Sequence, residues 1–124
     1  MSKFVRVKTE LRALALIKQS LDDLALKYSE DAEYSHIWSG FRQKIPLVVR
    51  EQGVAYGFQL NTDGVYEVLA DDMQLGRIQK SLQAIRQRYA YHQVLATAEQ
   101  AGFDLIDEQV GKDHVIRLTV RKWS

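Results

Sequence analysis

Three histidines, His36, His92 and His114, are the side chains that would most readily transfer a proton near neutral pH or ligate a metal ion. They lie far apart in the sequence, and none has the H-x-x-x-H spacing that puts two ligands on one side of a helix. The chain has no cysteine, which excludes thiolate catalysis and cysteine-ligated metal centres. The sequence therefore predicts no metal site and no cofactor.

A carboxylate beside a histidine is the other arrangement that could perform acid–base chemistry. Asp71 and His92 could meet at one end of the predicted sheet, although nothing in the local sequence requires it. The chain contains neither a G-x-S-x-G motif nor a glycine-rich phosphate loop. We therefore expect no catalytic residues, and an enzyme with an Asp71–His92 site is the weakest of three hypotheses.

A basic and aromatic strand face supports the second hypothesis. Arg117, Arg121 and Trp123 alternate onto one side of the end of the chain, where a strand is predicted from His114 to Lys122. Arginines beside an aromatic ring can neutralise and stack on single-stranded RNA or DNA, and Arg6 and Lys8 would add to this face if the first strand lay alongside. The net charge is only +1, so a solvated basic face is the favoured interpretation.

One long helix is predicted from about residues 75–77 to a left-handed stop at Gly102. Its inward stripe steps by four and three residues, through Ile78, Leu82, Ile85, Tyr89, His92 and Ala96. The other side of its second half is also apolar and consists of Tyr91, Val94 and Ala98, with Leu95 on a flank and Arg88 at the border. A helix that is apolar on two sides is normally covered on both.

Two coverings of that second apolar side are equally compatible with the sequence. Residues 29–44, interpreted as a long connection with at most a short strand, could fold back over it and carry Trp38 and Phe41 there. Otherwise a second copy or another protein would dock there. The leading hypothesis is a non-enzymatic accessory protein that acts through protein contacts, as a homodimer or as a small subunit of an assembly.

The remaining patterns give the fold. A strand at Phe4–Lys8 precedes a helix from Leu11 to about Tyr28, with Thr9 as its expected cap. Apolar strands flank the turn at residues 61–64, and two more strands follow the long helix. The order β-α-β-β-β-α-β-β predicts a single α+β domain over residues 1–124, with a mainly antiparallel sheet of about six strands and both helices on one face.

Composition sets the remaining bounds. The 124 residues are 46% hydrophobic and 27% charged, which is typical of a globular domain with one core. No apolar run is long enough to cross a membrane, and the first residues lack the apolar core of a signal peptide. We expect a cytoplasmic protein, or a stromal one if it is organellar, with no membrane insertion.

Several motifs resemble those of a known family. They are the run from Arg88 to His92 (R-Y-A-Y-H), Gly102-Phe103, the run from Tyr66 to Asp71, and the terminal Arg121-Lys122-Trp123. Together they resemble the hypothetical chloroplast reading frame thirty-five family of small cyanobacterial and plastid proteins. The likeness spans nearly the whole chain. It implies a cyanobacterial or plastid origin, and it brings no reaction, cofactor or catalytic residue.

Overall fold

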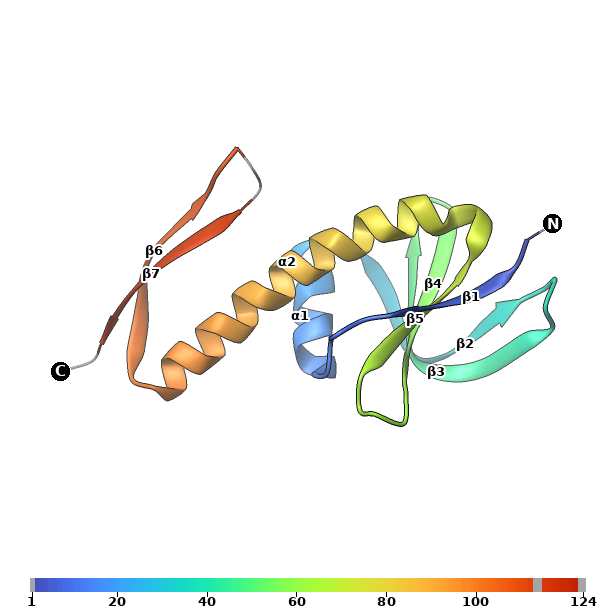
Figure 1. Ribbon diagram of the computed structural model, residues 1–124, viewed down its shortest axis with the longest axis horizontal. Helices are drawn as coiled ribbons and strands as arrows, with labels where there is room; N and C mark the ends of the chain where they lie inside the picture. The colour runs from blue at the N-terminus through green and yellow to red at the C-terminus, as the bar shows by residue number, and fades with distance from the viewer. Residues whose placement is uncertain (1, 113–114, 123–124) are drawn as a thin grey trace.

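The computed structural model describes residues 2–112 and 115–122, and within them the protein has an α+β fold with mainly antiparallel sheet. This confirms the predicted fold class, with seven described strands where about six were expected. Figure 1 shows the elements. In chain order they are β1 (Phe4–Lys8), α1 (Leu14–Asp23), β2 (Lys27–His36), β3 (Phe41–Glu51), β4 (Val54–Leu60), β5 (Tyr66–Asp71), the 3₁₀ turn η1 (Asp72–Gln74), α2 (Leu75–Gln100), β6 (Phe103–Val110) and β7 (Ile116–Lys122).

The strands form two separate sheets. Five of them pair antiparallel in the order β1-β5-β4-β3-β2, while β6 and β7 pair only with each other. In Figure 1 this terminal hairpin lies at the far end of α2, away from the five-stranded sheet. Strand β1 therefore does not lie beside β7, and Arg6 and Lys8 do not extend the basic face of the last strand.

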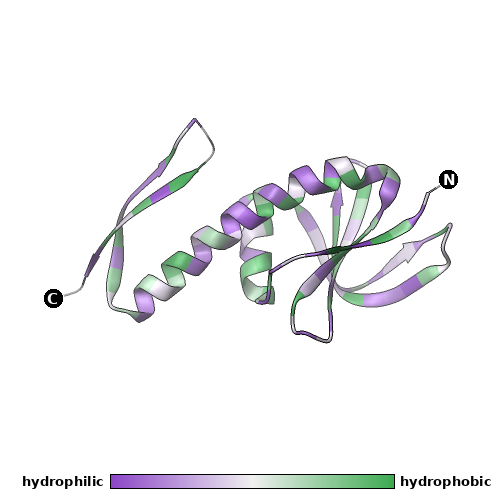
Figure 2. Ribbon diagram, viewed as in Figure 1, coloured by the Kyte–Doolittle hydropathy of each residue, from purple (hydrophilic) through white to green (hydrophobic). Residues whose placement is uncertain are grey.

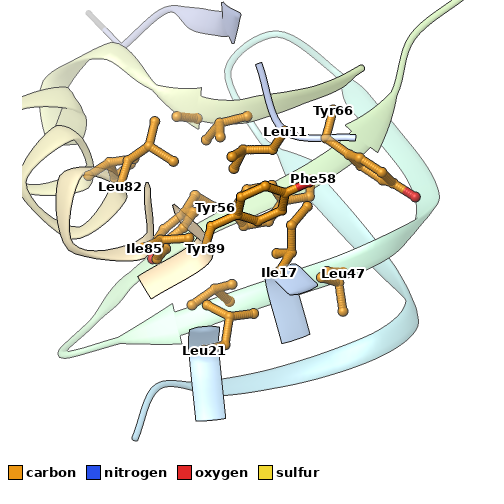
Figure 3. Packing of buried hydrophobic residues seen from close by; sticks show 14 of the residues in the cluster. Leu11, Ile17, Leu21, Leu47, Tyr56, Phe58, Tyr66, Leu82, Ile85 and Tyr89 are labelled. Atoms are coloured by element: carbon orange, nitrogen blue, oxygen red, sulfur yellow. The ribbon is translucent and has the colours of Figure 1, made fainter. Parts of the chain in front are cut away.

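One face of the five-stranded sheet packs against both helices, as the sequence predicts. Tyr56 and Phe58 of β4 are fully buried there, and the phenol of Tyr56 is 2.7 Å from the hydroxyl of Ser81 on α2. Figure 3 shows the close packing of this core. Its helical residues are Ile17 and Leu21 of α1 and Ile78, Leu82, Ile85 and Tyr89 of α2.

The other face has a smaller apolar cluster of its own, formed by Tyr34, Ile45, Val48 and Leu69 with Phe4 and Phe41 against them. Ile45 lies over Gly57 so closely that a β-carbon at residue 57 would collide with its Cδ1 atom. Phe4 and Phe41 stack with ring centroids 4.4 Å apart. Through this contact the end of the β2–β3 hairpin nearest its turn packs against β1.

Residues 29–44 are not a long connection, so that prediction is wrong. They belong mainly to β2 and β3, which are joined by a short turn. Strand β2 is at the sheet edge and most of its side chains are exposed, so it lacks the apolar alternation that marks a half-buried strand. Trp38 is 72% exposed in the turn, and neither it nor Phe41 covers α2.

The first helix is also shorter than predicted. It starts at Leu14, and Ala25 has a left-handed backbone (φ 55°) just after its end, so the chain turns into β2 at Lys27. Thr9 does not cap it. Instead, the Thr9 hydroxyl accepts a hydrogen bond from the N–H of Leu11 at 3.1 Å and donates one to the backbone oxygen of Tyr66 in β5. Apolar periodicity alone overestimates this helix because Leu11 and Leu24 pack on the same core from outside it.

Candidate functional site

Helix α2 extends beyond the domain core. Its buried residues end at Tyr89, whereas Ala96, predicted to face inward, is exposed. The helix continues for eleven residues to Gln100, which at about 1.5 Å per residue adds about 16 Å. The prediction of one continuous helix is confirmed, and so is the outward direction of Val94, which is 49% exposed. The second half of α2 and the β6–β7 hairpin thus form an arm, clearly separate from the sheet in Figure 1.

A groove of about 690 Å³ lies between α2 and the hairpin. Along β7 half-buried residues alternate with exposed ones, and Ile116 and Leu118 are half-buried and line the groove. Figure 2 shows the same alternation of apolar and polar residues along the hairpin ribbon. The complete lining is Lys80, Gln83, Ala84, Gln87, Ala90, Tyr91 and Val94 of α2 with Val115, Ile116 and Leu118 of the hairpin.

A chain of polar contacts joins the arm to the core beside this groove. Asp23, at the end of α1, accepts hydrogen bonds from Arg88 at 2.9 Å and from His92 at 2.6 Å. On the hairpin side the carboxylate of Glu108 accepts a hydrogen bond from the phenol of Tyr91 at 2.9 Å, and the Arg88 guanidinium lies 3.8 Å from the same carboxylate. The Arg88 guanidinium also lies over the Tyr91 ring, 4.2 Å from its centroid. These contacts fix the orientation of the hairpin relative to α2.

Two pKa shifts reflect this chain of contacts. Partial desolvation of Asp23 would raise its pKa, but the hydrogen bonds from His92 and Arg88 outweigh that effect and the pKa is lowered. Desolvation raises the pKa of Tyr91, and its hydrogen bond to Glu108 raises it further. Asp23 therefore stays ionised and Tyr91 stays protonated at neutral pH, as the bonds between them and their partners require.

Of the residues predicted to bind a partner, Tyr91 and Val94 line the groove. Arg88 lies just outside it and contacts the carboxylates of Asp23 and Glu108, while Leu95 and Ala98 are half-buried and do not line it. Sequence reasoning missed Glu108 and Asp23 as partners of α2. It also placed the last two strands in one sheet of about six strands, whereas they form a separate hairpin. The alternation of Ile116, Leu118 and Val120 was the available signal for a second apolar surface.

The predicted nucleic-acid face is only partly described. Arg117 and Arg121 are exposed on β7, and Trp123 lies outside the described residues. Directly across the ladder, Arg121 pairs with Asp104 and Arg117 pairs with Gln109. Asp104 thus places one acidic side chain opposite these arginines, which lowers the attraction of this face for phosphates. Single-strand binding stays a prediction.

The predicted Asp71–His92 pair does not form, so that hypothesis is corrected. Asp71 contacts His36, with Oδ2 3.0 Å from Nε2, and His92 contacts Asp23. Asp71 precedes α2 and His92 lies seventeen residues beyond its start, about 26 Å along the helix. Around His36, Ser39 places its hydroxyl 2.8 Å from Nδ1, and that hydroxyl also accepts the N–H of Phe41. This cluster closes the β2–β3 turn and joins it to β5.

No group of histidine and acidic side chains within residues 2–112 and 115–122 is arranged to hold a metal ion. No helix in the same part of the chain is long and apolar enough to cross a bilayer. The fold therefore defines a small α+β protein with a largely apolar groove between α2 and the β6–β7 hairpin.

The chain belongs to the family described as "Protein of unknown function (DUF1257)", which matches residues 20–119. It is 35% identical to "Uncharacterized protein ycf35" of Guillardia theta, over 99% of this chain and 98% of that protein. Proteins of the same name from Pyropia yezoensis and Cyanophora paradoxa are 27% and 26% identical over at least 98% of each chain. These findings confirm the resemblance to the cyanobacterial and plastid family. No solved structure matches.

Proposed function

We propose that this protein is a non-enzymatic accessory protein that binds a segment of another protein in the groove between α2 and the β6–β7 hairpin. The observation that carries the proposal is the exposure of Val94, 49%, within a groove whose two walls are largely apolar. None of the residues that line the groove belongs to the hydrophobic core cluster, which α2 enters with Ile78, Leu82, Ile85 and Tyr89. Apolar surface that the core does not need is typical of a contact surface.

The size of the groove suits a protein segment. From Lys80 to Val94 the α2 wall comprises fifteen residues and is about 21 Å long. Burying a fully exposed valine contributes about 1.5 kcal/mol, so covering the exposed half of Val94 would contribute roughly half as much, and several such contacts are needed for a stable complex. The wall offers Tyr91 and Val94 from α2 and Ile116 and Leu118 from β7. A large aromatic residue among aliphatic ones is a common centre for binding energy.

The polar contacts beside the groove also support a binding role. Arg88 contacts both Asp23 and Glu108, and His92 contacts Asp23, so these side chains help to hold the two walls in position. A groove whose walls are fixed before binding loses less conformational entropy when a partner enters. The arm is therefore suited to binding, and no set of unpaired acid and base groups in the described residues faces the groove to perform a reaction.

The test is a matched pair of variants. Val94→Asp places a charge in the groove, and Gln93→Asp places the same charge one residue away on an exposed position outside the lining. A partner captured from nuclease-treated cyanobacterial lysate is purified and titrated against each variant. We expect at least tenfold weaker binding for Val94→Asp and unchanged binding for Gln93→Asp. Equal effects of the two substitutions would show that the contact lies elsewhere.

Light scattering after size exclusion tests whether the occupant is a second copy. The proposal of a different protein expects a monomer at high concentration. A dimer that dissociates in the Tyr91→Asp, Val94→Asp double variant would replace the proposed partner with the chain itself. Capture of a partner from untreated lysate only, with none from nuclease-treated lysate, would instead favour the single-strand-binding alternative at Arg117 and Arg121.

A further inference from the structure

We infer that the segment bound in this groove is an amphipathic helix with carboxylate side chains near one end, a conclusion that rests on the proposed function. It follows from three features of the groove: where its unpaired charges lie, which backbone groups it offers, and the spacing of the α2 side chains that line it.

The charges of α2 are strongly one-sided. Between Leu75 and Ala98 the helix has four cations, Arg77, Lys80, Arg86 and Arg88, and no acidic residue. Arg86 is paired with Glu10 and Arg88 with Asp23. Within the described residues Lys80 has no ion pair, and Arg77 only donates to the main-chain oxygen of Gln52 at 3.3 Å. The two cations without a carboxylate partner thus lie together near the start of α2.

These two cations stand at one end of the groove. Lys80 lines the groove itself, and a shallow hollow that continues it is lined by Arg77, Lys80 and Gln83. A neighbouring hollow includes Glu51, which forms no ion pair with either cation. At the other end the charges are already neutralised, because Glu108 is held by Arg88 and Tyr91. A ligand that spans the groove would therefore meet largely apolar walls along its length and free positive charge at one end.

The backbone requirements favour a helix over an extended segment. An extended chain must find partners for its N–H and C=O groups when water is removed. The groove meets β7 through Ile116 and Leu118, whose side chains share one face of the strand, whereas backbone pairing takes place along a strand's edge. Opposite them are the small side chains of Ala84 and Ala90. A helix satisfies its own backbone and can pack closely on such small residues.

The spacing of the α2 wall agrees with this choice. Lys80, Ala84, Gln87, Tyr91 and Val94 follow each other at intervals of four and three residues, so they form one straight row on the helix surface. Rows of this kind pack into the grooves of a second helix. A bound helix with apolar residues at the same intervals would fill the space, with its acidic end beside Lys80 and Arg77.

The experiment uses two synthetic helical peptides of sixteen residues with the same leucine face. One carries three glutamates at one end and the other carries three lysines there. Binding to the full chain is measured by fluorescence anisotropy at low salt and at 0.5 M salt. Two surface ion pairs should make the acidic peptide bind about fivefold to tenfold more tightly. High salt should remove most of the difference.

Three variants localise the effect. Arg77→Glu with Lys80→Glu should abolish or reverse the preference for the acidic peptide. Lys27→Glu, an exposed change on the edge strand β2, should leave it intact. Val94→Asp should weaken both peptides alike.

Equal affinity for both peptides, with both weakened by Val94→Asp, would overturn this inference and leave the groove function standing. A preference for the basic peptide, or no binding of either at millimolar concentration, would overturn the inference as well. A preference for the acidic peptide that is indifferent to Val94→Asp would move binding away from the groove and overturn both proposals.

Discussion

The phenolic oxygen of Tyr89 lies 3.0 Å from the backbone nitrogen of Ala13 and accepts its N–H. The same oxygen accepts the N–H of Arg12 at 3.2 Å. Helix α1 begins at Leu14 without a side-chain cap, so a residue on α2 holds the backbone at its entry. The Arg88–His92 run therefore contributes to both ends of α1, because Arg88 and His92 hold Asp23 at its last residue.

Removing that hydroxyl should destabilise the protein. Tyr89→Phe removes the acceptor of the Arg12 and Ala13 N–H groups, and the Tyr89 side chain is only 6% exposed, so little water can replace it. We expect a loss of about 1–3 kcal/mol in the free energy of unfolding, measured by urea denaturation. Tyr91→Phe is the matched control, since its hydroxyl bonds to Glu108 at the surface, and it should cost clearly less. Equal losses for the two variants would contradict this role of Tyr89.

Gly57→Ala should overpack the second face of the sheet. The new β-carbon would collide with Cδ1 of Ile45 and lie 3.3 Å from the carbonyl oxygen of Leu47. We expect a loss of about 1–3 kcal/mol in unfolding free energy. Adding Ile45→Val removes the colliding methyl group and should restore part of that loss. Two independent, additive losses would show that the collision is not the cause.

The ionised carboxylate of Asp23 should stabilise the folded protein at neutral pH, and this contribution should be lost in acid. Its pKa is lower in the folded protein than its ordinary value of 3.8, because the bonds from His92 and Arg88 outweigh desolvation. A lowered pKa means that the contribution is complete above about pH 4–5 and is lost as the pH falls through the folded pKa. Asp23→Asn should therefore be less stable than the wild type at pH 6 and nearly equal to it at pH 2–3.

Thermal unfolding between pH 2.5 and pH 7 measures this difference. Asp63→Asn, an exposed change in the β4–β5 turn, is the control and should keep the pH profile of the wild type. A constant offset between Asp23→Asn and wild type at every pH would argue against a role for the ionised carboxylate.

Glu108→Ala should loosen the hairpin and leave the five-stranded sheet intact. It removes the acceptor of the Tyr91 phenol and the carboxylate 3.8 Å from Arg88. Loss of about 1 kcal/mol of local stability should raise amide exchange rates in β6 and β7 about fivefold. Hydrogen exchange followed by mass spectrometry measures the amide exchange rates of both sheets in one experiment. Asp107→Ala, at the neighbouring exposed residue of β6, should leave those rates unchanged.

Local patterns in the sequence predicted the elements that depend on short-range chemistry. The β4–β5 hairpin follows from the turn at residues 61–64, where Gly64 has φ 78° and donates to Asn61. The long helix follows from the stripe Ile78–Tyr89, and its end follows from Gly102, which has φ 84°. Each of these depends on the conformational preferences of a few consecutive residues.

Other elements could not be predicted from local patterns because distant residues create them. Strand β2 has an exposed polar face and exists through its pairing with β3. The histidine partners are decided in the same way. His36 finds Asp71 and His92 finds Asp23, pairs that are 35 and 69 residues apart in the sequence.

The sequence by itself determined an α+β domain, a continuous α2 helix and a second apolar side on that helix, because periodicity fixes which residues share a helix face. It could not decide what lies opposite that side. Only the tertiary structure separates β6 and β7 from the main sheet and turns Ile116 and Leu118 toward Tyr91 and Val94. The physical reason is that a strand's partner is selected by long-range pairing and packing, and alternating apolar residues suit a large sheet and a lone hairpin equally well.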